Sequence, residues 1–142
     1  MSNAGAGGTV LLADNDPDIL QLARYRIEQA GFEVITARDG EQALSMIVDR
    51  EPDVAVLDVT MPKLTGHEVT RQVRRHERVG RTPIIILSGS VKQSDIGLSL
   101  DAGANDHIEK PFSPAELLER VRALIAEHRA SSGDQGTDAG HR

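Results

Sequence analysis

The chain has 142 residues, of which 39% are hydrophobic, and it contains no cysteine. This length predicts one globular domain, and the lack of cysteine excludes a disulfide framework, a thiolate nucleophile and a cysteine-ligated zinc. Sixteen Lys and Arg against 22 Asp and Glu give a formal net charge of −6. That balance argues against nucleic-acid or anionic-membrane binding, because phosphate contacts need an excess of basic residues. No apolar run approaches the roughly 20 residues that span a bilayer, so we expect a cytoplasmic protein.

The two ends of the chain predict little regular structure. Residues 1–8 are small and glycine-rich, and their Ser-Asn-Ala segment is typical of a purification-tag remnant. Residues 129–142 lack an apolar period, so burial could not compensate the entropy of ordering them. We expect a disordered or tag-derived N-terminus, an ordered domain over 9–128, and a disordered tail or truncated linker after it.

The first half of the domain alternates short apolar runs with segments of helical period. A strand is predicted at 10–13, a helix over 18–30 with a glycine after its end, and a strand at 33–37. Asp39 with Gln42 resembles a capping box and opens a second helix, which buries an apolar face through residue 48. A third strand follows at 54–57.

The second half repeats the alternation. Thr65 with Glu68 is another capping box, and it opens a helix that we expect to run to about residue 79. A strand at 84–87, a helix near 94–102 and a short strand near 107–109 come next. Ser113, followed by proline at the first helical position, opens the last helix.

These are five strand–helix units in series. Strands that are apolar on both faces predict a parallel sheet covered by helices on each side, an α/β doubly wound sandwich of three layers. Right-handed crossovers leave few strand orders, and either common doubly wound order binds ligands beyond the carboxyl ends of the strands. The residues that follow each strand therefore carry the functional prediction.

Carboxylates, a hydroxyl and an ammonium follow these strands. Asp14 and Asp58 each follow an apolar run, and two such charges in proximity are unfavourable unless a cation lies between them. A hard divalent ion with oxygen ligands, Mg²⁺ or Mn²⁺, meets that need. Lys110 and Ser88 would add a second positive charge and a hydrogen-bond donor. Together these groups could neutralise a transferring phosphoryl group, and a carboxylate can itself accept it.

Five sequence motifs resemble the receiver domain of bacterial response regulators. Each is weak alone, but all five stand in the expected order at the expected strand ends. The resemblance covers about residues 9–128 and implies a flavodoxin-like (βα)5 fold with strand order 2-1-3-4-5. The motifs are Asp14–Asp18, Leu57–Pro62 with Gly66, Leu87–Gly89, Ala102–Asp106 and Lys110–Phe112.

The resemblance implies roles for the matching residues. Asp58 corresponds to the acceptor of a phosphoryl group from the phosphohistidine of a partner kinase. Asp14 corresponds to a first metal-binding acid that acts largely through water, and the carbonyl of Thr60 to a further metal ligand. Lys110 corresponds to the lysine that pairs with Asp58 and then with the phosphoryl group. Ser88 corresponds to the switch hydroxyl, and Lys110–Pro111 to a cis peptide bond.

Two positions depart from the family pattern. Asn15 stands where a second metal-binding acid is usual, so one formal charge is missing and we expect weaker Mg²⁺ binding. His107 stands where Tyr or Phe is usual, and we expect its coupling to Ser88 to be weaker or pH-sensitive because imidazole is smaller and titrates near neutrality. The other histidines of interest, His67, His76 and His128, are expected to be solvated.

The resemblance also implies partners: a sensor histidine kinase or phosphotransfer protein, and a downstream protein or a missing effector domain. A face from about Ser94 to Leu124 is the expected partner or homodimer contact. We expect a signalling protein without direct nucleic-acid or membrane contact, not an enzyme. The alternatives are a degenerate receiver that binds partners without phosphorylation, a haloacid-dehalogenase-like phosphatase with Asp14 as nucleophile, and a flavin-binding domain. An EF-hand is excluded because Ile19 and Tyr25 replace its glycine and glutamate.

Overall fold

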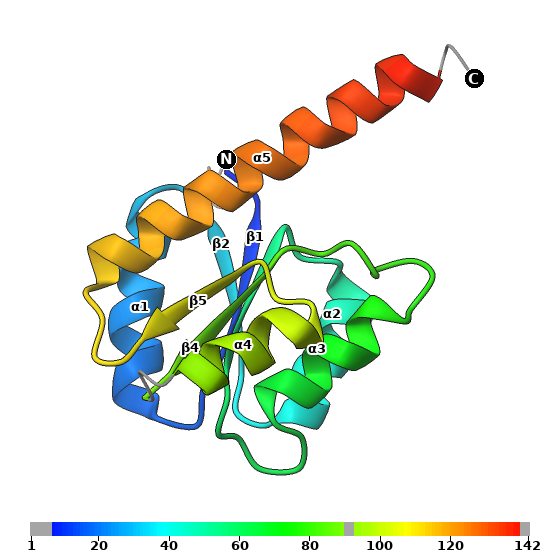
Figure 1. The fold of residues 1–142 in the computed structure, drawn as a ribbon. Coiled ribbons are helices and arrows are strands. Elements are labelled where there is room, and N and C mark those ends of the chain that lie inside the picture. The colour runs from blue at the N-terminus through cyan, green and yellow to red at the C-terminus, as the bar shows by residue number, and fades with distance from the viewer. Residues whose placement is uncertain (1–6, 90–92, 140–142) are drawn as a thin grey trace.

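A computed structural model of the chain describes residues 7–89 and 93–139. These residues form one parallel sheet of five strands in the order β2-β1-β3-β4-β5, which confirms the predicted doubly wound topology (Figure 1). The strands are β1 (Thr9–Ala13), β2 (Glu33–Ala37), β3 (Val54–Asp58), β4 (Ile84–Ser88) and β5 (Asp106–Glu109). The helices are α1 (Pro17–Gln29), α2 (Gly40–Arg50), α3 (Gly66–Arg74), α4 (Gln93–Ala102) and α5 (Pro114–Ala139). None of the described helices is both long and apolar enough to cross a membrane.

Two apolar layers hold the sheet between its helices. Successive residues of a strand point to opposite faces, and β1 divides accordingly: Val10 packs with α1 and α5, whereas Leu11 packs with α2 and α3. Figure 1 shows α1 and α5 on one side of the sheet and α2, α3 and α4 on the other. Every residue of β3 and β4 is buried, as expected for central strands of a parallel sheet.

The predicted helix caps are present. Asp39 accepts a hydrogen bond from the backbone N–H of Gln42 (2.8 Å), and Ser113 Oγ accepts one from Glu116 (3.0 Å). Thr65 and Glu68 form a reciprocal capping box at the start of α3. Side-chain acceptors satisfy N–H groups that a helix leaves unpaired at its start, which fixes where α2, α3 and α5 begin.

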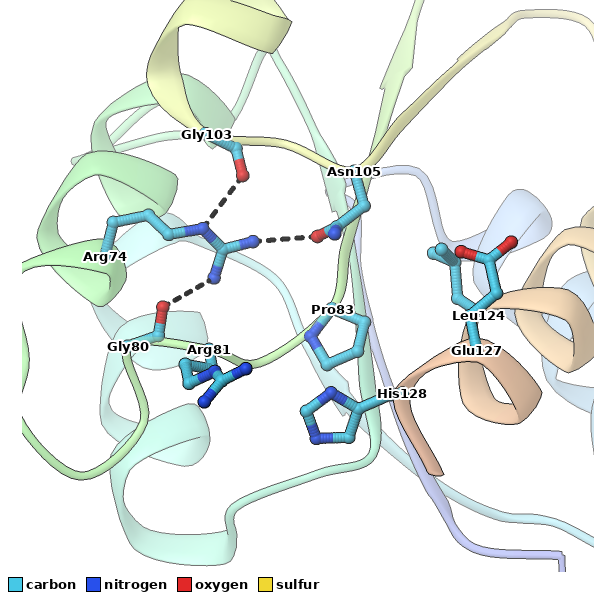
Figure 2. A pocket seen from close by; sticks show the side chains of 9 residues that line it. All are labelled: Arg74, Gly80, Arg81, Pro83, Gly103, Asn105, Leu124, Glu127 and His128. Carbon is cyan, nitrogen blue, oxygen red and sulfur yellow. Dashed lines mark hydrogen bonds between the residues drawn. The ribbon is translucent and has the colours of Figure 1, made fainter. Parts of the chain in front are cut away.

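Helix α3 is shorter than predicted. It ends at Arg74 instead of continuing to about residue 79. The Arg74 guanidinium donates hydrogen bonds to the carbonyl oxygens of Gly80 and Gly103 and to Asn105 Oδ1 (Figure 2). It also donates to the carbonyl oxygen of Thr82 (2.7 Å). The chain after α3 therefore folds back around this side chain. A hollow of about 410 Å³ beside it lies where β4 begins, at the opposite end of the strand from Ser88.

Both ends of the chain carry more structure than predicted. Helix α5 continues to Ala139 and projects beyond the sheet (Figure 1), which corrects the expectation of disorder for 129–139. A helix gains one hydrogen bond for each residue added, and no proline follows Pro114. Gly7 N–H donates to the Gly31 carbonyl (3.0 Å), so Gly7 and Gly8 are also ordered beside β1 and β2. Residues 1–6 and 140–142 lie outside the described residues.

Candidate functional site

The sheet brings the predicted residues to one edge. Asp58 is the last residue of β3 and pairs in register with Leu87 of β4, while Asp14 directly follows β1. Ser88 ends β4, and its carbonyl accepts a hydrogen bond from the backbone N–H of Lys110 (2.7 Å). Because β1, β3, β4 and β5 are parallel neighbours, their carboxyl ends meet. The clustering expected from the sequence is therefore present.

The Lys110 ammonium contacts both carboxylates. Its Nζ lies 2.9 Å from Asp14 Oδ2 and 3.2 Å from Asp58 Oδ2. Asp14 and Asp58 are buried, with 1% and 5% of their surfaces exposed, and the Lys110 side chain retains 20%. The Lys110–Pro111 peptide bond is cis, as the resemblance implies. Two buried negative charges thus share one ammonium.

Burial and charge shift two pKa values in the site. Burial raises the pKa of Asp58, the charge of Asp14 raises it further, and the contact with Lys110 opposes both. Burial alone would lower the pKa of Lys110, but its hydrogen bonds and charge interactions with Asp14 and Asp58 outweigh this and raise it. The Lys110 ammonium therefore stays protonated. The ionised form of Asp58 is unfavourable, because burial and the charge of Asp14 together outweigh the contact with Lys110.

The loop after β1 provides a hydrogen-bond donor to only one oxygen of Asp14. Asp14 Oδ1 accepts a hydrogen bond from the backbone N–H of Asp16 (3.0 Å). Among the described residues, only the Lys110 ammonium, 2.9 Å away, contacts the buried Asp14 Oδ2. Asp16 turns away to cap α1, accepting from the N–H of Asp18 (3.0 Å). It therefore cannot replace the acid that is missing at the exposed Asn15.

These residues fit a hard divalent cation. Asp14 Oδ2, which the described residues leave with no partner besides the shared ammonium, and the unfavourable negative charge of Asp58 are the features that such an ion satisfies. In the described part of the chain, no group of three or more His, Cys, Asp or Glu could hold a metal. Further ligands would be carbonyl, amide or water oxygens, which Mg²⁺ accepts beside one or two carboxylates. Asn15 lies in the loop after β1, and Thr60 lies in the loop after β3. The N–H of Thr60 is 3.4 Å from Asp58 Oδ1.

Helix α3 begins directly against the Asp58 backbone. The N–H of Gly66 donates to the carbonyl of Val59 (3.0 Å). A Cβ atom at Gly66 would lie only 2.5 Å from the carbonyl oxygen of Asp58, closer than real Cβ contacts. Glycine is thus required for this approach, which gives a physical reason for its place in the motif.

The His107 ring contacts Ser99 of α4. Its Nδ1 lies 2.8 Å from Ser99 Oγ, and Nε2 of His67 lies 2.9 Å from the same oxygen. The expectation that His67 is solvated is therefore wrong. Sequence reasoning also missed Ser99, which is fully buried. Its spacing of three residues from the buried Ala102 on one helix face is the signal that could have identified it.

Comparisons with known proteins agree with this geometry. The model of the response regulator receiver domain family matches residues 10–122. The alkaline phosphatase synthesis transcriptional regulatory protein PhoP of Bacillus subtilis is 40% identical over 131 residues, which cover 91% of this chain and 54% of that protein. The phosphate regulon transcriptional regulatory protein PhoB of Pseudomonas aeruginosa is 37% identical, with 90% and 55% covered. The chain thus spans about half the length of these curated relatives.

Solved structures are similar over nearly their whole length. The Francisella response regulator 1452 receiver domain matches with a TM-score of 0.80 and 35% identity, covering 85% of this chain and 98% of that one. The receiver domain of sensor histidine kinase PA1611 from Pseudomonas aeruginosa has a magnesium ion coordinated in its active site cleft. It matches with a TM-score of 0.78 and 32% identity, covering 84% and 98%. Fold, strand-end cluster and sequence agree: the chain belongs to the response regulator receiver domain family.

Proposed function

We propose that the chain accepts a phosphoryl group on Asp58, with a divalent cation bound beside it, and thereby switches a partner-binding face. The observation that carries this proposal is the pair of buried carboxylates, Asp14 and Asp58, on the single Lys110 ammonium. Because burial and Asp14 make the ionised Asp58 unfavourable, its carboxylate gains from bonding to an electrophile or from contact with a cation.

In the proposed reaction, an Asp58 carboxylate oxygen attacks the phosphorus of a phosphohistidine on a sensor histidine kinase or phosphotransfer protein. A phosphorus–oxygen bond forms, and the phosphorus–nitrogen bond breaks with its electron pair leaving on the imidazole. The product is an aspartyl phosphate. Lys110, already 3.2 Å from Asp58, would follow the new charge onto a phosphoryl oxygen, and the hydroxyl of Ser88 would donate to another.

Asp14 and Asp58 would hold the cation, Mg²⁺ or Mn²⁺, together with the Thr60 carbonyl and the Asn15 side chain. When bound, the cation neutralises charge on the transferring group and fixes its position. The magnesium ion in the related PA1611 receiver supports this assignment. The amide of Asn15 brings no charge, so affinity would rest mainly on the two carboxylates.

The output would come from a downstream protein or from an effector domain attached to this one. The curated relatives are transcriptional regulatory proteins of nearly twice the matched length, which supports an attached domain. The proposed contact, for a partner or a second copy, is the face of α4, β5 and α5. Leu98 and Leu100 of α4 are about half exposed there (46% and 53%). We assign no nucleic-acid contact to this domain itself.

The test is phosphorylation by acetyl phosphate with Mg²⁺, measured by intact mass, in the wild type, Asp58→Asn and Asp14→Asn. We expect a labile adduct in the wild type that is lost in Asp58→Asn and forms slowly in Asp14→Asn. An adduct that persists in Asp58→Asn contradicts the assignment of the acceptor. No adduct in the wild type would favour a phosphorylation-independent binding module, and steady turnover that requires Asp14 would favour a phosphatase.

A further inference from the structure

A buried polar bridge joins three elements beside the proposed site. Ser99, in α4, is fully buried, and its Oγ lies 2.9 Å from Nε2 of His67 in α3 and 2.8 Å from Nδ1 of His107 in β5. A hydroxyl has one proton, so at least one of the two imidazole rings must donate into Ser99 Oγ. The two rings and the hydroxyl are therefore orientationally coupled, and loss of the hydroxyl would remove a partner from both rings.

The His67 end of the bridge is mechanically tied to Asp58. His67 follows Gly66, whose Cα lies so near the Asp58 carbonyl that a Cβ there would be 2.5 Å from it. Gly66 also donates to the Val59 carbonyl (3.0 Å) and accepts from Thr70 Oγ1 (2.7 Å). The Thr65–Glu68 capping box further fixes this turn. A shift of the backbone after β3 must therefore carry His67 with it.

The His107 end of the bridge is incompletely satisfied. Its Nε2 is buried and has no hydrogen-bond partner among the described residues. A buried polar atom without a hydrogen-bond partner is unfavourable, so other contacts of the His107 ring must keep the ring in this position. The inward orientation of His107 thus depends on Ser99, and weakening that contact would favour a different orientation of the ring.

We propose that His67 is a positioning residue that couples the Asp58 site to α4 and β5 through the Ser99 hydroxyl. This inference rests on the function proposed above and adds a route through α3 that does not use Ser88. Movement at Asp58 and Val59 displaces the first turn of α3 and with it His67. The hydrogen bond between His67 and Ser99 then strengthens or weakens, which shifts α4 and the His107 ring.

The test compares His67→Phe with His67→Gln, because glutamine keeps a hydrogen-bonding group near the place of Nε2 and phenylalanine keeps only the ring. Each protein is activated with beryllofluoride and Mg²⁺. Fluorine NMR reports binding at Asp58, and backbone amide shifts report the response of α4 and β5. We expect all three proteins to bind beryllofluoride. In His67→Phe the equilibrium constant for the α4–β5 response should fall about fivefold, the lower end of usual couplings, and His67→Gln should restore most of it.

Ser99→Ala is the second variant, and it should weaken the response as His67→Phe does. The nitrogen shifts of the His107 ring should also change in Ser99→Ala, which a passive packing role for Ser99 would not cause. A full α4–β5 response in both His67→Phe and Ser99→Ala overturns the inference while leaving the proposed function intact. Equal losses in His67→Phe and His67→Gln also overturn it. A wild type that binds no beryllofluoride overturns the proposed function, and the inference with it.

Discussion

The same substitution should have opposite effects at two helical glycines. Gly66 begins α3 and Gly97 lies inside α4. A Cβ atom at Gly66 would meet three backbone atoms, at 2.5 Å from the oxygen and 3.1 Å from the carbon of the Asp58 carbonyl and 3.3 Å from the Val59 Cα. A Cβ atom at Gly97 would meet nothing within 4 Å. The pair therefore separates helix propensity from steric contact.

The magnitudes follow from these contacts. Alanine is favoured over glycine in a helix interior by about 1 kcal/mol, so Gly97→Ala should raise the free energy of unfolding by about that amount. At Gly66 the gain is smaller, because the residue occupies the first helical position. The clash is with backbone, which cannot rotate away, and overpacking of this kind usually costs about 1–3 kcal/mol. Gly66→Ala should therefore be destabilised by about 1–2 kcal/mol.

Urea unfolding followed by circular dichroism measures both effects, provided that the slope with urea is unchanged. Phosphorylation by acetyl phosphate is the second measurement, and we expect it to be slowed only in Gly66→Ala, where α3 must retreat from Asp58. A Gly66→Ala protein as stable as the wild type would refute the close approach on which this reasoning rests. A destabilised Gly97→Ala protein would refute the reasoning about open space in α4.

Three further predictions concern charge and hydrogen bonding. Without metal at pH 7, Asp58→Asn should unfold at a higher urea concentration than the wild type, since burial and Asp14 raise the pKa of Asp58 and make its ionised form unfavourable in the folded state. This advantage should shrink as the pH falls through that raised pKa toward the ordinary 3.8, and equal midpoints at pH 7 would contradict it. Asn15→Asp should bind Mg²⁺ at least about tenfold more tightly by calorimetry; equal or tighter binding by the wild type counts against the missing-charge argument. Arg74→Met should lower the free energy of unfolding by about 2–4 kcal/mol, because four acceptors lose a charged donor, and a loss below 1 kcal/mol would show that water replaces it.

The strand-end cluster could be predicted because its signals are local. Apolar runs located the strands, capping residues located the helix starts, and parallel pairing then placed Asp14, Asp58, Ser88 and Lys110 at one edge without knowledge of any side-chain contact. The resemblance added the strand order and the cis bond before Pro111. Each of these features follows from short stretches of sequence or from a rule of topology.

The features that were missed depend on contacts between distant segments. Helix α3 ends early because Arg74 binds carbonyl groups up to 29 residues away, which no helix period reveals. His67 stands at a helix start, where side chains are usually solvated, and only the fold brings Ser99 to it, 32 residues along the chain. Helix α5 continues past residue 128 without an apolar period, because each added residue gains a backbone hydrogen bond that composition does not reveal.

Asn15, one of the two departures from the family pattern, changes the charge balance of the site. With Asn15 in place of an acid, Asp14, Asp58 and Lys110 leave the resting site with one uncompensated negative charge, which burial already makes unfavourable. A third carboxylate would strengthen metal binding but would increase repulsion whenever the metal is absent. Phosphorylation would replace one charge on Asp58 by about two on the phosphoryl group, so the need for a cation becomes greatest in the modified state. We therefore expect Asn15 to shift metal dependence from the resting protein toward its phosphorylated form.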